Sequence, residues 1–114
     1  MPFVDVKISK KIEDNKIVEV KNELGKAIAL FPGKTEAWLM CNIESGKDMF
    51  FAGDNKAACA FVEVKLFGNV DKSSSDMFTR HMCSYLNNLL DISPDRIYVR
   101  YEGGTDWGWN GSNF

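Results

Sequence analysis

The sequence predicts an α+β fold in which two βαβ repeats form a four-stranded mixed sheet, with two helices on one face and short edge strands. Residues 3–8 alternate between apolar and polar side chains, which is the period of a half-buried strand. Apolar residues recur at helical spacing over 17–31 and again over 78–89. Because both halves follow the order strand, helix, strand, we expect one domain that covers residues 1–114.

In the first half, the strand over residues 3–8 leads into a helix that begins near Glu13-Asp14-Asn15, where the side chains can cap backbone groups. Pro32-Gly33 ends this helix. Residues 38–43 are then expected to form a second, largely buried strand. After a turn over 44–48, residues 49–51 are expected to add a short edge strand.

The second half repeats this order, although the identity between the halves is too low to demonstrate a duplication. Residues 58–67 read as a strand with alternating apolar positions. Hydroxyl and acidic groups over 73–76 favour a helix start there. Ser93-Pro94-Asp95 interrupts the chain, and residues 96–102 form the last alternating strand.

If both helices cover one face of the sheet, the other face mixes large aromatic side chains with charges. Such a surface suits neither a dry core nor open solvent, so we expect subunits to close on one another. The alternative is a monomer with an unusually apolar sheet surface. The residues of this face are Phe3, Asp5, Lys7, Phe61, Glu63, Lys65, Phe67, Tyr98, Arg100 and Glu102.

Composition excludes several classes of function. The net charge is −2 and the basic residues are scattered, so no nucleic-acid or membrane partner is indicated. Three cysteines at wide spacing suggest reduced thiols rather than a disulfide framework. A single histidine, His81, argues against a metal site, and we expect no cofactor. No signal segment precedes the first strand, which predicts a cytoplasmic protein.

Pro2 is the first candidate for chemistry. Initiator methionine is normally removed before a small residue, and its removal would make Pro2 a free secondary amine. Terminal amines titrate near ~7.7–8.0, and an apolar pocket lowers that value. Pro2 is therefore a candidate general base at neutral pH. The alternative is that Met-Pro, a common start, has no functional meaning.

Other motifs remain open on the residues alone. Gly33-Lys34-Thr35 imitates the end of a phosphate-binding loop, but it lacks the earlier glycine and follows a helix rather than a strand, so we reject that function. Lys34 is either a solvated lysine or a group that holds a carboxylate or an oxyanion. Tyr98 and Arg100 point the same way on one strand. The aromatic tail 107–114 is either a strand that docks on a neighbour or the wall of an apolar pocket.

Four segments together resemble the macrophage migration inhibitory factor family of the tautomerase superfamily: Pro2, Gly33-Lys34, residues 93–98 and the ending 107–114. The resemblance implies a homotrimer with three active sites at subunit interfaces. It places the family's catalytic proline on Pro2 and its pocket lysine on Lys34. It further implies that the adjacent subunit contributes Tyr98. Phe67 falls on the isoleucine whose backbone helps to bind substrate, and Trp109 and Phe114 match the apolar wall.

Some positions depart from the family pattern. Arg100 stands in place of asparagine, where it would either recognise a substrate carboxylate or crowd the site. Trp107 replaces a smaller aliphatic residue, and the loop before it is slightly shorter. Cys59 lacks its CxxC partner, so a thiol oxidoreductase activity is not carried over. The segment 10–12 matches the family's receptor contacts poorly.

The resemblance predicts a keto–enol tautomerase for arylpyruvates, of the phenylpyruvate tautomerase or dopachrome isomerase type, with Pro2 as general base. Lys34 and Arg100 would hold the carboxylate or enolate oxygen, while Tyr98, Phe67, Trp107 and Trp109 shape the pocket. The alternative is a cytokine-like binding protein with weak or vestigial activity and an extracellular receptor. Family members act outside cells without a signal peptide, so secretion is compatible with this second function. A third alternative is a structural oligomer with neither activity.

Overall fold

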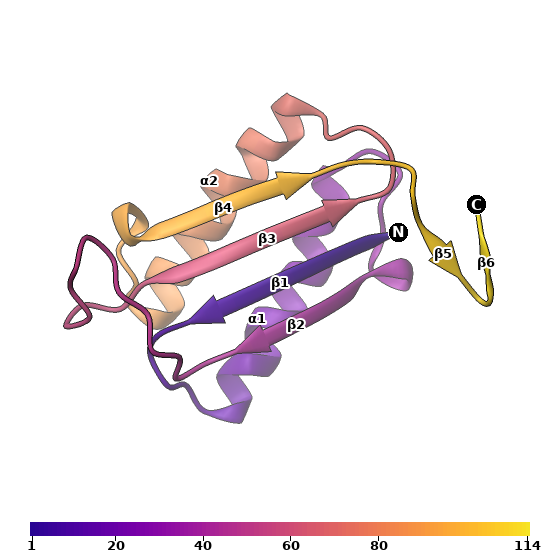
Figure 1. The fold of residues 1–114 in the computed structure, drawn as a ribbon. Helices are drawn as coiled ribbons and strands as arrows, with labels where there is room; N and C mark the ends of the chain where they lie inside the picture. Colours follow the sequence, from indigo (N-terminus) through magenta and orange to yellow (C-terminus); the bar gives the residue numbers. More distant parts are fainter.

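The computed structural model describes residues 1–114 and confirms the predicted four-stranded mixed sheet (Figure 1). The strands are β1 (Pro2–Ile8), β2 (Met40–Glu44), β3 (Ala60–Leu66) and β4 (Ile97–Glu102), in the spatial order β2-β1-β3-β4. β1 runs parallel to β2 and antiparallel to β3, and β3 runs parallel to β4. Both parallel pairs are therefore strand–helix–strand units, joined edge to edge through β1 and β3.

Two helices cover one face of this sheet, as predicted (Figure 1). α1 (Asp14–Ala27) continues into a short 3₁₀ helix over Ile28–Leu30. α2 spans Lys72–Leu90 and begins slightly earlier than the serine run predicted. Its cap is Asp71, whose carboxylate accepts hydrogen bonds from the Ser74 backbone N–H at 3.0 Å and the Ser74 hydroxyl at 2.7 Å. The acidic cap also suits the positive end of the helix dipole.

The core lies between the sheet and the helices. The alternation predicted for β1 and β3 is present in both strands, whose inward side chains are buried while the outward ones stay partly exposed. An aromatic pair anchors the helix layer, with the Phe31 and Phe78 rings 5.5 Å apart. This buried layer holds the outward face of the sheet, and hence the strand ends, in place. Its strand residues are Val4, Val6, Ile8, Ala60, Val62, Val64, Leu66 and Ile97.

Two predictions in the first half are wrong. The second strand begins at Met40 rather than Trp38, because Glu36–Trp38 form a 3₁₀ helix. This strand is also not largely buried: it lies at the edge of the sheet, and Met40 is 69% exposed. Residues 49–51 form no edge strand, and only one isolated bridge joins Phe51 to Asp54.

The chain ends in a small hairpin that extends beyond the amino end of β1 (Figure 1). β5 (Gly108–Trp109) and β6 (Ser112–Asn113) pair in antiparallel fashion around Asn110-Gly111. Both turn residues have positive φ angles, 53° and 87°, as a two-residue hairpin requires. Neither helix of the protein is long and apolar enough to span a membrane.

Candidate active site

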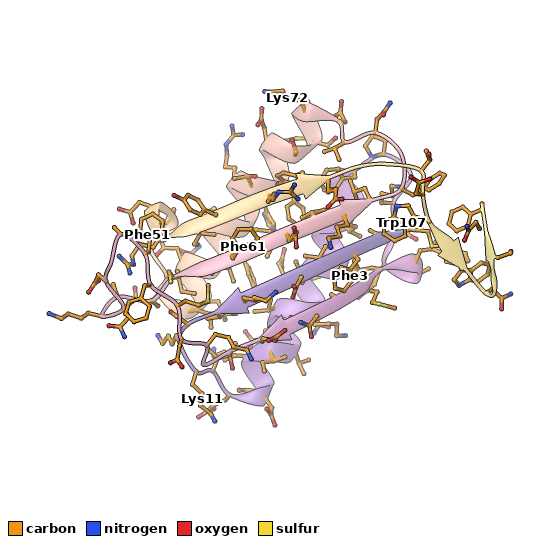
Figure 2. The ribbon with its side chains drawn as sticks, viewed as in Figure 1. Phe3, Lys11, Phe51, Phe61, Lys72 and Trp107 are labelled. Atoms are coloured by element: carbon orange, nitrogen blue, oxygen red, sulfur yellow. The ribbon has the colours of Figure 1, made fainter.

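A mostly apolar pocket of about 350 Å³ lies at the amino end of β1. Pro2 is the first residue of β1, lies buried opposite Leu66 of β3, and contributes to the pocket wall. A second hollow of about 420 Å³ shares Met1, Trp38 and Trp109 with it. Figure 2 shows Trp107 beside this end of the sheet, whereas Phe51 lies at the opposite end. The lining of the first pocket is Met1, Pro2, Phe3, Ala37, Trp38, Leu39, Met40, Trp107, Gly108 and Trp109.

The electrostatics of this pocket favour a neutral amine. Burial, and then the nearby charge of Lys34, lower the pKa of the Met1 α-amino group from its ordinary value of 8.0. The Met1 carbonyl accepts the backbone N–H of Phe67 at 3.0 Å, which ties the chain terminus to the end of β3. Removal of Met1 would make Pro2 the terminal amine, buried at the wall of a pocket whose remaining lining is largely apolar.

Lys34 lies in the loop that follows α1 and acts electrostatically on the Met1 amine, although it is not one of the residues that line the pocket. Its backbone N–H donates to the Phe31 carbonyl at 3.1 Å, which fixes the loop against the end of the helical segment. Its Nζ donates to the Phe67 carbonyl at 2.9 Å and lies 5.9 Å from the centroid of the Phe67 ring. The side chain is half-buried. Lys34 is therefore a cation held against Phe67 near the chain terminus rather than a freely solvated lysine.

Aromatic residues from separate segments form the pocket wall. The Trp38 and Trp109 rings meet edge to face, with their centroids 5.3 Å apart. The rings of Phe67 and Phe114 lie 5.1 Å apart, and the Phe114 N–H donates to the Trp107 carbonyl at 3.2 Å. The tail 107–114 thus contributes to the pocket within its own chain, in agreement with one of its two predicted roles.

Trp38 is a site residue that sequence reasoning missed. We interpreted it as the first residue of a buried strand, but the 3₁₀ helix turns it out toward the pocket, where it is 53% exposed. The available signal was its position four residues after Lys34, beyond a loop that begins with Pro32-Gly33. A large aromatic residue only four residues from a candidate binding lysine is more typical of a pocket wall than of the core.

Tyr98 and Arg100 share the open face of β4, as predicted, but both lie away from Pro2 in the single chain. In the sheet register Pro2 is opposite Leu66, whereas Tyr98 is opposite Phe61. At about 3.3 Å per residue, the offset of five residues from Leu66 to Phe61 separates Tyr98 from Pro2 by about 16 Å along the strand. The ring of Tyr98 instead lies 5.3 Å from that of Phe51.

Arg100 already has acidic partners. Its Nη1 lies 3.3 Å from the Glu63 carboxylate and 3.5 Å from that of Glu102. Three positions along β3 place it about 10 Å from the level of Pro2. Arg100 and Tyr98 can therefore act on a Pro2 pocket only if that pocket belongs to another copy of the chain.

The remaining side chains offer no metal centre. The chain has no group of three or more His, Cys, Asp or Glu residues that could hold a metal ion. The largest hollow, about 520 Å³, lies elsewhere and has mainly polar walls from the loops near Lys47 and Lys56. It contains none of the predicted site residues. The groups that the structure brings to the Pro2 end of the sheet are the chain-terminal amine, the aromatic walls and the nearby Lys34 ammonium.

Comparison with solved structures defines the class of protein first. The chain is similar to MIF2 of Leishmania major, with 29% identity and a TM-score of 0.90 over 100% of this chain and 97% of that chain. It is also similar to the macrophage migration inhibitory factor homologue of Prochlorococcus marinus, with 28% identity and a TM-score of 0.80 over 98% of each chain. The fold is therefore that of the migration inhibitory factors.

Sequence comparison then establishes the family. The chain is 30% identical to mouse macrophage migration inhibitory factor over 95 residues, which cover 82% of each chain. The family profile described as "Macrophage migration inhibitory factor (MIF)" matches residues 1–114. The chain belongs to the macrophage migration inhibitory factor family, within the tautomerase superfamily. The resemblance drawn from four short segments is thus confirmed.

Proposed function

We propose that this protein is a keto–enol tautomerase that acts on arylpyruvates, with Pro2 as its general base after removal of Met1. The observation that carries the proposal is the position of Pro2, which is buried at the wall of an apolar pocket. In the same place, burial and then Lys34 lower the pKa of the Met1 amine, and we expect both causes to act on the Pro2 amine once Met1 is removed. A neutral amine at physiological pH can accept a proton from carbon, which a protonated amine cannot. Family membership supports the same reaction class.

In the proposed reaction, different residues transfer the proton, hold the anionic groups of the substrate and bind its aryl ring. Pro2 removes a proton from the carbon next to the substrate carbonyl, becomes a secondary ammonium, and returns a proton to the enolate oxygen; the reverse sequence converts enol to ketone. Lys34 holds the substrate carboxylate or the developing enolate oxygen, because its Nζ is positioned at the pocket edge by the Phe67 carbonyl. Trp38, Trp107 and Trp109 accept the aryl ring.

The proposal includes a homotrimer in which each site lies at a subunit interface. Its support is the distribution of exposed groups: Met40 at the free edge of β2 is 69% exposed, and Tyr98 at the other end of the sheet is 63% exposed. A second copy that covers this surface would bring Tyr98 and Arg100 to the Pro2 pocket of its neighbour. Their roles as substrate-binding residues, and the location of the protein in the cell, stay predictions.

The test is an enol-to-keto assay with phenylpyruvate on protein whose loss of Met1 has been verified by mass. Loss of general-base catalysis typically costs about 10²–10⁴ in rate, so Pro2→Gly should reduce kcat by that factor while the fold is retained. Pro94→Gly is the matched control, because this proline starts a 3₁₀ helix near β4 and lies outside the pocket. It should keep full activity.

Two outcomes would contradict the proposal. Pro2→Gly that retains most of its activity would exclude Pro2 as the base. A correctly processed wild-type protein without activity would mean that Arg100 or Trp107 obstructs the pocket. The alternative function, a cytokine-like binding protein with a vestigial site, would then be the one to pursue.

A further inference from the structure

Phe67 contacts Lys34 in two separate ways. The Lys34 Nζ donates to the Phe67 backbone carbonyl at 2.9 Å, and it also lies over the Phe67 ring, 5.9 Å from the centroid. The first contact would survive any substitution at position 67, whereas the second requires an aromatic ring. An ammonium group within about 6 Å of a ring centroid is attracted by the negative face of the ring.

The Phe67 ring also packs against a second aromatic ring, that of Phe114. Its centroid lies 5.1 Å from that of Phe114, at an interplanar angle of 38°. Phe114 is tied to the tail by the hydrogen bond from its backbone N–H to the Trp107 carbonyl at 3.2 Å. A continuous set of contacts therefore runs from Phe114, through two tilted rings, to the ammonium group of Lys34.

We propose that the Phe67 ring, supported by Phe114, is a positioning residue that holds the Lys34 ammonium beside the terminal amine. This inference rests on the proposed function, and it assigns to the ring of Phe67 a role beyond that of a pocket wall. A lysine side chain has high conformational entropy, which an unheld Lys34 would lose on binding a carboxylate. Restricting it before the substrate arrives removes part of that cost.

The first readout is substrate affinity. A cation–π contact at a partly exposed site corresponds to about a two- to fivefold change in a binding constant. Phe67→Leu, which keeps an apolar side chain but has no ring, should raise KM for phenylpyruvate by this factor. Phe67→Tyr, which keeps the ring face, should raise KM less than Phe67→Leu does. Phe114→Leu removes only the support and should give a smaller rise in KM, and its position at the chain end makes it a safe second variant.

The second readout needs no turnover. Cyanate carbamylates only the neutral form of an amine, so the pH midpoint of Pro2 carbamylation, followed by intact mass, reports the pKa of that amine. Phe67→Leu removes the ring contact but keeps the carbonyl contact, so the Lys34 ammonium is held less firmly near the amine. The midpoint in Phe67→Leu should therefore move to higher pH, by less than in Lys34→Met. Because this measurement is independent of catalysis, it tests the positioning role even if the tautomerase proposal fails.

A double-variant cycle separates positioning from packing. In a Lys34→Met background there is no ammonium to position, so adding Phe67→Leu should leave the carbamylation midpoint unchanged. An equal change in both backgrounds would overturn the inference, because the ring would then act on the amine without Lys34. Equal behaviour of Phe67→Tyr and Phe67→Leu would also overturn it.

Discussion

Lys34→Met is the substitution that tests the electrostatics of the pocket most directly. Methionine keeps most of the length of the side chain but removes the ammonium group that donates to the Phe67 carbonyl at 2.9 Å. Hydrogen bonds to charged groups contribute about 1.5–3 kcal/mol. If the half-buried ammonium makes one such bond to the substrate carboxylate, kcat/KM should fall by about 10- to 150-fold, since ~1.4 kcal/mol corresponds to a factor of ten.

The pH dependence of kcat/KM in Lys34→Met provides a second, independent test, because the direction of its shift can be predicted. Burial and Lys34, in that order, lower the pKa of the Met1 amine, and the same causes are expected to act on the Pro2 amine of the processed protein. Removing Lys34 leaves only burial, so the pKa should rise part of the way back toward its ordinary value. The amine acts as a base only when it is neutral, and the acid limb of kcat/KM should therefore move to higher pH.

Phenylpyruvate kinetics between pH 5 and 9 measure both effects, with Lys26→Met as the control. Lys26 is an exposed lysine in the last turn of α1, outside the Pro2 pocket. Its variant should match wild type in kcat/KM and in the acid limb. If Lys34→Met stayed within about twofold of wild type and kept the same acid limb, the assignment of Lys34 to substrate binding would be refuted.

Three further predictions concern the fold around the site. Phe78 is 0% exposed, so Phe78→Ala should lower the free energy of unfolding in urea by about 3–5 kcal/mol. Met77 is 42% exposed, and Met77→Ala should lower it far less. Gly111 lies in the hairpin turn with a φ of 87°, so Gly111→Ala should strain the turn, loosen the hairpin and raise KM. The control is Gly53→Ala, at a φ of 78° at the far end of the sheet, which should leave KM unchanged. The pKa of Tyr101 is raised from 10.0 to about 12, mainly by burial. The folded state thus keeps a proton that the unfolded chain loses, so the free energy of unfolding should fall as pH rises from about 10 to about 12. Tyr101→Phe should flatten this dependence of stability on pH. An unchanged dependence would contradict the raised pKa of Tyr101.

Local patterns accounted for most of the elements. The alternation in β1 and β3 has a period of two residues and the stripes of α1 and α2 a period close to 3.6, so each can be read without knowledge of its neighbours. The predictions for residues 38–43 and 49–51 failed because apolar composition was taken as burial. Those residues lie at a free edge or in a loop, where apolar side chains stay exposed unless another chain covers them.

Individual site residues could be predicted from the sequence more easily than the full set of residues that come together at the site. Pro2, Lys34 and the tail 107–114 were all selected from the sequence, but the part played by Trp38 was missed because a 3₁₀ helix and a strand start look alike over three residues. Tyr98 is expected to come from the adjacent subunit, and the register of β4 against β3 places both Tyr98 and Arg100 far along the sheet from the Pro2 of their own chain, so their site roles stay predictions. Register depends on long-range pairing, which no local window contains.

The sequence by itself determined the class of fold, the two strand–helix–strand halves, the candidate base at Pro2 and the membership of the family. These depend on local periodicity and on short segments whose residue types can be read directly. Only the tertiary structure decided that Lys34, Phe67 and Phe114 meet, since they come from three separate segments that the order β2-β1-β3-β4 brings to one end of the sheet. The physical reason is that a contact between distant segments is set by strand pairing and core packing, and both of these are properties of the whole chain.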